Sequence, residues 1–335
     1  MKVAINQVKG NSGIDVWAQS LCKGLQKAGV SCDVDLLPGF FQYFPGLIPI
    51  RTTPSGTSDI IQSHTWNGFG FRNETPLVVT EHGVLQDPLF DPYKSPLQKL
   101  YHRYLFRYEK KSLAVADAVV CVSYNTRERL KEVFGYSGAH VIYNGIDASV
   151  FRPREIAGDP WDLPQNKTIL LFAGNLSRRK GADLLPGIMK NLGDDYLLLT
   201  TSGNRNRSST GIPHSRNLGH LAPEQLIHAY NRCDLFILPS RLEGLSLSVL
   251  EAMACGKPVV AFNCSSFPEL IIDEKGGFLP EKDNIEEFAD RIRLLAGDPY
   301  LIRQMGLFNR ERIVEQFTLE RMVSGYMQLY TTLLD

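Results

Sequence analysis

The chain has 335 residues, of which 43% are hydrophobic and 21% charged, and its basic and acidic side chains cancel to a net charge of zero. This length suits two domains of ordinary size, and the composition is that of a globular protein. The balanced charge gives no global reason to bind nucleic acid, so we expect no nucleic-acid partner, and only a local cluster could attract a membrane.

Six cysteines are scattered along the chain without a Cys-x-x-Cys pair, which favours reduced thiols over disulfides or zinc ligands. The opening MKVAINQV predicts a strand rather than a signal peptide. No apolar run reaches the length of about 18 residues that a membrane-spanning helix needs. We therefore expect a cytoplasmic protein.

Short apolar runs alternate with helical patterns in both halves of the chain. In the first half, strands are predicted at 3–8, 59–64, 76–82 and 117–123, with a helix at 14–28. In the second half, strands are predicted at 168–174, 195–203, 234–240 and 257–262, with helices near 181–191, 223–232 and 246–255. Three further helices, 284–297, 300–314 and 318–333, follow without strands between them.

Apolar strands that are separated by helices indicate parallel sheets in doubly wound α/β domains. A segment rich in proline and charge, 151–167, predicts the domain boundary. We assign 1–155 to an N-terminal domain and 165–315 to a C-terminal domain, and we treat 316–335 as a final helix. Open α/β sheets bind ligands at the carboxyl ends of their strands, so the loops that follow the strands are the candidate sites.

The loop after the first strand, 8–16, contains Gly10 and Gly13, which would let the backbone approach a phosphate before a helix. Its spacing is not Gly-x-Gly-x-x-Gly, so the dinucleotide fingerprint is missing. A plain tight turn explains this loop as well as a substrate loop does.

The loop after the first strand of the second half, 173–185, is basic. It carries Arg178, Arg179 and Lys180, and cations at this place could offset the charge of a departing diphosphate. The alternative is a solvated basic turn.

Residues 240–262 place Glu243 after an apolar strand and Glu251 within the following helix, which ends at Gly256. A helix start offers unpaired N–H groups and a positive dipole end, and both suit a diphosphate. The two carboxylates could hold hydroxyl groups on either side of that phosphate. An ordinary amphipathic helix with solvent-facing glutamates is the alternative.

The segment 240–262 resembles the E-x7-E signature of the retaining glycosyltransferases of family 4, which have the GT-B fold. The segments VIYNGIDASVFRP at 141–153 and AGNLSRRKGADLL at 173–185 are similar to two further motifs of that family. The second departs from the family pattern G-R-L-x-x-x-K-G, because Asn175 stands where arginine is usual. The likeness implies two Rossmann-like domains that face each other across a cleft, with the final helix returning to the N-terminal, acceptor-side domain.

The resemblance also implies a reaction. A sugar would pass from a nucleotide-diphosphate donor to an acceptor hydroxyl with retention of anomeric configuration, as in the synthesis of cell-surface polysaccharides, glycolipids or glycoconjugates. No Asp-x-Asp motif lies in a suitable loop, so we expect no metal and no other cofactor. The donor sugar, the base (UDP, GDP or ADP), the acceptor, the linkage and the oligomeric state stay open.

The family's roles carry over to the matching positions of this chain. Glu243 would contact the donor sugar, Lys180 the leaving diphosphate, and His82, in VTEHGV, the reacting sugar. Glu251 would hold the nucleotide ribose. The other substrate-binding positions would be Gly13, Arg178, Arg179, Gly203, His220, Leu221, Gly244, Leu245, Ser246 and Leu247. One of the two arginines would replace the arginine that is missing at Asn175.

Other functions remain open on the same residues. An epimerase or a phosphorylase could share the fold, although no clear setting for a pyridoxal-phosphate lysine is present. A Rossmann oxidoreductase is disfavoured by the missing glycine fingerprint. A non-catalytic carbohydrate- or membrane-binding protein would explain Asn175.

Residues 93–112 predict a basic amphipathic helix. Basic side chains recur every four residues and apolar ones share another face: Lys99, Arg103, Arg107 and Lys111 against Leu97, Leu100, Tyr104 and Tyr108. Together with an aromatic loop at 36–50, this pattern is typical of a protein at an anionic membrane surface, here the inner membrane face, with a lipid-linked acceptor. A solvated charged face over a core stripe is the alternative.

Overall fold

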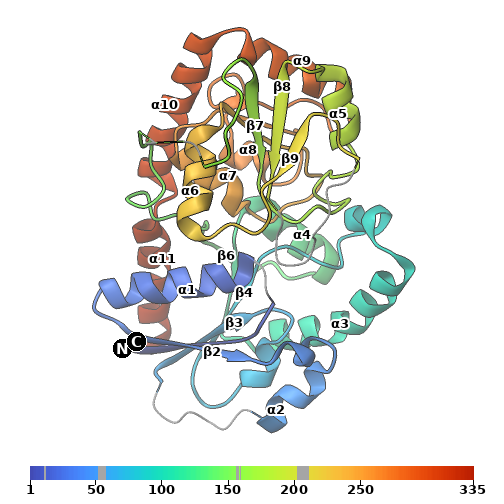
Figure 1. Ribbon diagram of the computed structural model, residues 1–335. Coiled ribbons are helices and arrows are strands. Elements are labelled where there is room, and N and C mark those ends of the chain that lie inside the picture. Colours follow the sequence, from blue (N-terminus) through green and yellow to red (C-terminus); the bar gives the residue numbers. More distant parts are fainter. Residues whose placement is uncertain (11–12, 52–57, 156–157, 159, 202–210) are drawn as a thin grey trace. The chain divides into compact units, whose positions relative to one another are not determined.

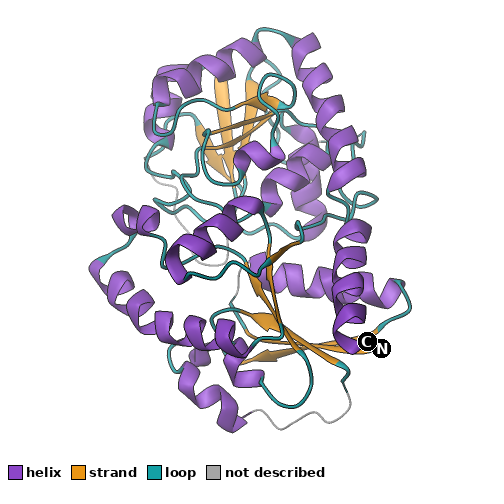
Figure 2. Cartoon of the chain, turned by 180° about the vertical axis from the view of Figure 1, so that it is seen from behind, coloured by secondary structure: helices purple, strands orange, loops and turns teal. Residues whose placement is uncertain are grey.

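The computed structural model describes residues 1–10, 13–51, 58–155, 158, 160–201 and 211–335 (Figure 1). The chain forms two compact units, of which the first comprises Met1–Gly145 and Leu319–Asp335 and the second comprises Ile146–Thr318. Each unit holds one six-stranded sheet whose paired strands are parallel, and helices flank the strands in both units (Figure 2).

The sheet of the first unit has the strand order β2-β1-β3-β4-β5-β6. Its strands are β1 (Lys2–Val8), β2 (Ser31–Leu37), β3 (Ile60–His64), β4 (Leu77–Glu81), β5 (Ala118–Cys121) and β6 (His140–Val141). The α-helices of this unit are α1 (Gly13–Lys27), α2 (Ile48–Arg51), α3 (Pro96–Val115), α4 (Tyr124–Phe134) and α11 (Leu319–Leu334). Short 3-10 turns form η1 (Gly39–Gln42), η2 (Pro45–Leu47), η3 (Gly68–Phe71) and η4 (Pro88–Tyr93).

The sheet of the second unit has the strand order β12-β11-β10-β7-β8-β9. Its strands are β7 (Thr168–Phe172), β8 (Tyr196–Thr200), β9 (Ser215–Asn217), β10 (Leu235–Leu238), β11 (Val259–Ala261) and β12 (Gly277–Phe278). Its helices are α5 (Leu185–Leu192), α6 (Pro223–Arg232), α7 (Leu247–Ala254), α8 (Phe267–Leu270), α9 (Ile285–Ala296) and α10 (Pro299–Gln316).

Both strand orders contain a switch point, where the chain reverses its direction of travel across the sheet. The second sheet has the order of the dinucleotide-binding doubly wound fold, and the first has the flavodoxin-like order with one more strand. The switch point therefore lies between β7 and β10 in the second unit and between β1 and β3 in the first. The loops at the carboxyl ends of these strands diverge and leave room for a ligand.

Helix α11 completes the core of the first unit. Its buried residues recur at helical spacing and pack with α1 over the sheet: Leu319, Met322, Val323, Tyr326, Leu329 and Tyr330. A Cβ atom at Gly24 would lie 2.5 Å from Val323 Cγ2, so this glycine lets α1 and α11 touch. Two tyrosines of α11 also bond to the strands of the sheet. Tyr326 Oη lies 2.9 Å from Thr80 Oγ1 of β4, and Tyr330 Oη donates to Gln62 Oε1 of β3 at 2.9 Å.

Some elements differ from the sequence-based expectation. The helix expected at 181–191 begins at Leu185, because Gly181 has a positive φ of 74° that a helix cannot continue through. The helix expected at 93–112 covers Pro96–Val115, because Ser95 caps it in a capping box with Gln98.

Four strands, β2, β6, β9 and β12, were missing from the sequence prediction. Strand β2 lies at a sheet edge and alternates exposed with buried residues, and the other three span only two or three residues. Among the described helices, none combines the length and the apolar character needed to cross a bilayer.

Candidate active site

The switch point of the second sheet brings together the basic loop and the first glutamate of the motif. The basic loop follows β7, the glutamate loop follows β10, and the two strands pair through Leu235 and Leu170. The loops bond directly, since the Arg241 amide donates to the Arg179 carbonyl at 2.9 Å and Ser240 Oγ donates to the same oxygen at 3.2 Å.

Gly181 makes this close approach possible. Its φ of 74° disfavours any side chain, and a Cβ atom there would lie only 2.0 Å from the Pro239 carbonyl oxygen. The glycine after Lys180 is therefore required by backbone geometry, because it lets the loop after β7 lie against the loop after β10.

The buried side chain of Arg241 joins the two loops through hydrogen bonds. Its buried guanidinium donates to both carboxylate oxygens of Asp183, at 2.7 and 3.1 Å, and it also donates to Asp283 and to the Arg178 carbonyl. A bidentate arginine–carboxylate pair fixes orientation as well as distance. Arg241 was not among the predicted site residues, because a single arginine after a strand gives no sign of the two aspartates that it joins.

Glu243 contacts two of the three cations of the basic loop. Its Oε1 atom lies 3.1 Å from Arg179 Nη1 and 3.4 Å from Lys180 Nζ, and it accepts a hydrogen bond from Ser240 Oγ at 2.9 Å. Its backbone is held as well, since the Glu243 amide donates to Ser265 Oγ at 3.0 Å and the Glu243 carbonyl accepts from the same hydroxyl at 2.6 Å. Ser265 was not among the residues predicted for the site.

The electrostatic balance keeps Glu243 ionised. Burial raises the pKa of its carboxyl, but the charges of Arg179 and Lys180 and the hydrogen bond from Ser240 outweigh burial and lower the pKa to about 2. The side chain is only 10% exposed, so solvent screens these charges weakly. A carboxylate and two cations thus form one cluster, which we call the charge cluster: Arg179, Lys180 and Glu243.

The two neighbouring arginines differ in position. Arg178 is exposed, whereas Arg179 donates to the Leu242 carbonyl and pairs with Glu243. Asn175 stands at the position where an arginine was expected, and its buried Oδ1 atom has no hydrogen-bond partner among the described residues. Only one of the two arginines, Arg179, therefore lies at the glutamate.

Helix α7 begins where the glutamate loop ends. Gly244, Leu245 and Ser246 lead into the helix at Leu247, and the first intrahelical bond runs from the Leu250 amide to the Ser246 carbonyl. The backbone N–H groups of the first turn come before that bond in the chain and have no acceptor within the helix, so they can donate to an anion.

Glu251 lies one helical turn further along α7. Its Oε2 atom accepts a 2.6 Å hydrogen bond from the phenol of Tyr230, a fully buried residue of α6. Burial raises the pKa of Glu251 to about 7, although the Tyr230 hydrogen bond and the charge of Lys180 act in the opposite direction. The carboxyl can therefore exchange its proton near neutral pH. Tyr230 was also missed, because a helical tyrosine gives no sign of its partner.

Two of the predicted substrate-binding residues, His220 and Leu221, lie on another loop of the second unit. His220 and Leu221 connect β9 to α6, with His220 exposed and Leu221 half-buried. No hydrogen bond or ion pair between described residues joins them to Glu243 or Glu251. Gly203 lies outside the described residues.

His82 belongs to an aromatic cluster in the first unit. It follows β4, its ring lies 4.7 Å from that of Trp17 and 4.9 Å from that of His64, and Trp17 in turn contacts Tyr326. Burial lowers the pKa of His82 well below its usual range, with a further contribution from His64, so the imidazole is neutral. Its buried Nε2 atom has no partner among the described residues.

Gly13 opens helix α1 at the switch point of the first sheet. Nearby, the Asp15 carboxylate accepts from the Gly10 amide at 3.1 Å and from Gln7 Nε2 at 2.9 Å, and Gln7 Oε1 contacts His64. The loop before α1 is thus tied to the histidine cluster by Asp15 and Gln7, neither of which was predicted.

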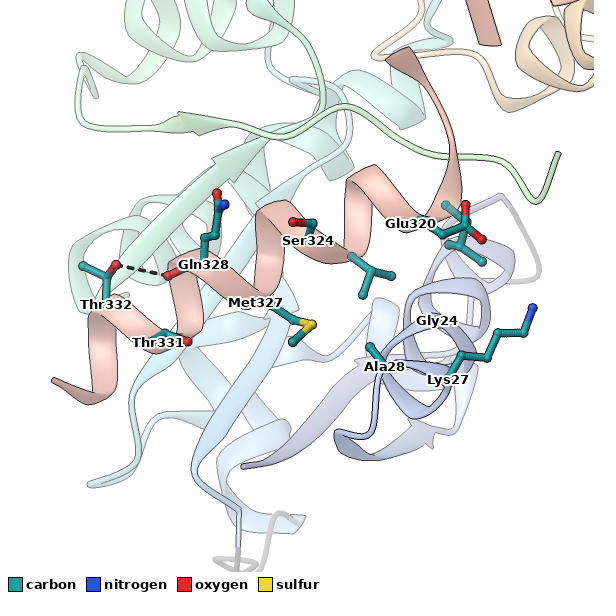
Figure 3. A pocket seen from close by; sticks show the side chains of 11 residues that line it. Gly24, Lys27, Ala28, Glu320, Ser324, Met327, Gln328, Thr331 and Thr332 are labelled. Atoms are coloured by element: carbon teal, nitrogen blue, oxygen red, sulfur yellow. Dashed lines mark hydrogen bonds between the residues drawn. The ribbon is translucent and has the colours of Figure 1, made fainter. Parts of the chain in front are cut away.

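A cavity of about 640 Å³ lies elsewhere in the first unit (Figure 3). Gly24, Lys27 and Ala28 line it from α1, and residues between Leu319 and Thr332 line it from α11. It contains none of the predicted site residues, so we do not assign the active site to it. Within the described parts of the chain, no group of three His, Cys, Asp or Glu side chains is placed to hold a metal ion.

Comparisons with known proteins bear on the family and the fold of the chain. Residues 154–312 match the model "Glycosyl transferases group 1", and residues 50–150 match the model "Glycosyltransferase Family 4". The α-maltose-1-phosphate synthase of Mycolicibacterium smegmatis is 26% identical over 307 residues, which cover 81% of this chain and 78% of the relative.

Solved structures share the whole fold at low sequence identity. A sucrose-phosphate synthase from Thermosynechococcus elongatus has a TM-score of 0.86 at 20% identity, and the match covers 99% of both chains. The Anabaena protein HepE, solved in complex with UDP and glucose, has a TM-score of 0.78 at 18% identity, again over 99% of both chains. These likenesses confirm the predicted pair of α/β domains, and with the two family matches they identify the chain as a glycosyltransferase with the GT-B fold.

Proposed function

We propose that this glycosyltransferase moves a sugar from a nucleotide-diphosphate donor to an acceptor hydroxyl with retention of anomeric configuration. The observation that carries the proposal is the charge cluster of Arg179, Lys180 and Glu243 at the switch point of the second sheet. Ligands of doubly wound sheets bind at such points, and two cations there suit a leaving diphosphate.

Each member of the charge cluster has a separate task in this reaction. Lys180 and Arg179 stabilise the negative charge that grows on the diphosphate as the glycosidic bond breaks, so their contribution is larger in the transition state than in the ground state. Glu243 stays ionised and accepts hydrogen bonds from hydroxyl groups of the donor sugar. Arg178, which is exposed, contributes little.

The rest of the donor site follows from helix α7 and its surroundings. The amides of Gly244, Leu245, Ser246 and Leu247 receive the diphosphate at the start of the helix. Glu251 accepts from the ribose hydroxyls. Gly203, His220 and Leu221 belong to the loops that receive the base, and Gly13 belongs to the substrate loop of the first unit.

His82 contributes from the first unit as a neutral imidazole near the reacting sugar. Burial keeps its pKa low, so it can exchange hydrogen bonds without bringing a positive charge to the oxocarbenium-like centre. Its buried Nε2 atom, which no described residue bonds, leaves one hydrogen-bonding position for the substrate.

In the proposed transfer, the bonds that form and the bonds that break balance without a cofactor. The bond between the anomeric carbon and the diphosphate oxygen breaks, the acceptor oxygen bonds to the same face of that carbon, and the acceptor proton passes to the departing diphosphate. The two cations and the helix start supply the charge stabilisation that a metal ion supplies in other enzymes, so we propose that no metal is required.

The first donor to test is UDP-glucose, because a protein of the same fold, HepE, was solved with UDP and glucose. For the acceptor we propose a lipid-linked intermediate of polysaccharide, glycolipid or glycoconjugate synthesis, with the enzyme attached peripherally to a membrane.

Thermal unfolding in the presence of UDP-, GDP- and ADP-sugars tests the donor. A ligand at a hundred times its dissociation constant stabilises the folded state by about 2.7 kcal/mol, so one nucleotide should give a clear shift. Release of the nucleoside diphosphate in the presence of membrane extract, measured with and without a chelator, then tests transfer and metal dependence. No shift with any nucleotide sugar, or activity that the chelator abolishes, would contradict the proposal.

A further inference from the structure

The solvent-facing side of α3 is apolar as well as basic. Leu97 and Leu100 are 76% and 66% exposed, and Tyr104 is exposed beside them. The buried face of the helix consists of other residues, namely His102, Leu105, Glu109, Ser112 and Leu113. The alternative of a core stripe through Leu97 and Leu100 is therefore wrong, because both leucines are exposed.

An aromatic segment lies beside this face of α3. Between η1 and η2, Tyr43 and Phe44 are 64% and 58% exposed, while Phe41 of η1 is buried and anchors the segment. The segment is attached to α3, since Tyr101 Oη donates to the Gln42 carbonyl at 2.7 Å and the rings of Tyr43 and Tyr101 lie 5.9 Å apart.

These exposed apolar side chains lie on the aromatic segment and on α3, which contact each other through Tyr101, and we call them the apolar patch: Phe40, Tyr43, Phe44, Leu47, Leu97, Leu100 and Tyr104. Soluble monomers rarely leave so many large apolar side chains together in water, and such patches mark interaction sites.

A row of cations borders the apolar patch on α3. Lys99, Arg103, Arg107 and Lys110 are exposed and follow each other at helical spacing. None of the ion pairs found among the described residues uses any of the four, whereas Lys94, at the start of the same region, pairs with Asp91 at 2.8 Å. This positive charge is therefore available to an external anion.

We propose that the apolar patch and the bordering cations of α3 dock this protein on an anionic lipid bilayer. Aromatic and leucine side chains would enter the boundary between headgroups and acyl chains, and the long basic side chains would reach the phosphates beside them. A row of cations that makes no ion pair among the described residues favours a negatively charged surface over a neutral apolar partner. The docking itself is independent of the donor site, and only its link to a lipid-linked acceptor rests on the proposed function.

Flotation of the full chain with vesicles tests the docking. The protein should float with vesicles of phosphatidylcholine mixed with an equal part of phosphatidylglycerol, and much less with phosphatidylcholine alone. Binding should also fall steeply as the salt rises, because the screening length shrinks from about 30 Å at 0.01 M to about 3 Å at 1 M.

Two variants separate the charge from the apolar contact. The triple change Lys99→Glu, Arg103→Glu and Arg107→Glu should weaken binding to anionic vesicles by on the order of a hundredfold or more, since each basic side chain near such a surface contributes about a factor of five. The double change Leu97→Ser and Leu100→Ser should weaken binding to the same vesicles while keeping its salt dependence.

A matched control lies on α10, where Arg303 and Leu307 are also exposed on a helix surface. Arg303→Glu and Leu307→Ser should leave vesicle binding unchanged. All variants should bind UDP as the wild type does, which keeps a failure of docking distinct from a failure of the donor site. An emission shift to the blue on adding anionic vesicles to Phe44→Trp would support insertion of the aromatic segment.

Three results would overturn the proposal. The wild type could ignore anionic vesicles at low salt, or the α10 control could lose binding as much as the α3 variants. Finally, the wild type could form dimers that the Leu97→Ser and Leu100→Ser change dissociates without affecting lipid binding. In that case the apolar patch is an interface between copies of this chain.

Discussion

The two sheets present similar switch points with opposite chemistry. At the switch point of the second sheet, Arg179, Lys180 and Glu243 form a charge cluster in which each charge has a partner. Near that of the first sheet, His64 and His82 lie against Trp17 and are kept neutral by burial. Parallel sheet topology thus provides the place for a site in both units, and the side chains on the loops decide whether it favours an anion or a neutral group.

The largest expected effect is a loss of turnover, and it concerns the charge cluster of the second unit. Lys180→Ala should lower turnover by about a hundredfold to a thousandfold, because the lysine charge acts most strongly as the diphosphate departs. Steady-state kinetics with the donor measures this loss, and Lys190→Ala, an exposed lysine of α5, is the control. Near-normal turnover in a folded Lys180→Ala protein would remove the charge cluster from the mechanism.

The loop contact behind the charge cluster can be broken separately. Gly181→Ala should lower the free energy of unfolding by about 3 kcal/mol, because the new Cβ would meet the Pro239 carbonyl in addition to the strain of a positive φ. Gly135→Ala has nearly the same φ, 70°, with no atom within 4 Å of the added Cβ, so it should cost only about 1 kcal/mol. Equal losses in urea unfolding would show that the loop contact adds nothing.

As the pH falls, the first of these regions to lose stability should be the one around the buried histidines of the first unit. The pKa of His64 is lowered by burial to about 3 from an ordinary value of 6.5, so the unfolded chain binds this proton before the folded chain does. Stability that depends on neutral His64 is therefore complete above pH 6.5 and is lost as the pH falls toward 3. The acid loss should amount to a few kcal/mol, and His64→Gln should reduce it. Urea unfolding at pH 7, 5 and 4 measures both slopes, and identical slopes would contradict the assignment.

The two arginines of the basic loop provide a smaller and sharper test. Arg179→Ala should weaken UDP binding by about 1.5–3 kcal/mol, the usual contribution of a charge-assisted hydrogen bond, whereas Arg178→Ala should change it little. Isothermal calorimetry compares them directly. Adding Asn175→Arg to the Arg179→Ala protein should restore part of the loss, because that position lies in the same loop. A larger effect of Arg178→Ala would reverse the assignment.

A change at Glu251 should have the smallest effect, and its effect on stability should depend on pH. Burial raises its pKa to about 7 from an ordinary value of 4.5, so the folded chain keeps a proton that the unfolded chain releases. Stability is therefore greatest below pH 4.5 and falls as the pH rises through 7. Glu251→Gln should be more stable than the wild type by about 1–2 kcal/mol at pH 8 and similar at pH 4, while binding UDP more weakly. A pH-independent stability difference would contradict the raised pKa.

Much of the fold was predictable because the buried parallel strands are short, apolar and separated by clear helices. Strands β3, β4, β5 and β10 are buried along their whole length, which is why apolar runs located them. Edge strand β2 was missed because its alternating pattern also fits a surface loop.

The site was predictable only as far as single motifs reach. The sequence motifs indicated Glu243, Lys180 and Glu251 as site residues, but they could not show which of Arg178 and Arg179 lies at Glu243. That difference depends on which side chain the turn at Gly181 directs toward Glu243. Arg241, Tyr230 and Ser265 act through partners far away in the sequence, and no local pattern announces such contacts.

Helix α11 has a consequence for the order in which the chain folds during synthesis. The first unit contains the start of the chain, yet its core needs Tyr326 and Tyr330 to cover α1 and to bond Thr80 and Gln62. The second unit is continuous from Ile146 to Thr318 and can close before α11 has left the ribosome. A growing chain must therefore hold an unfinished first unit, with Trp17 and its neighbours uncovered, until the last helix arrives. Chaperone dependence should accordingly be concentrated in the first unit.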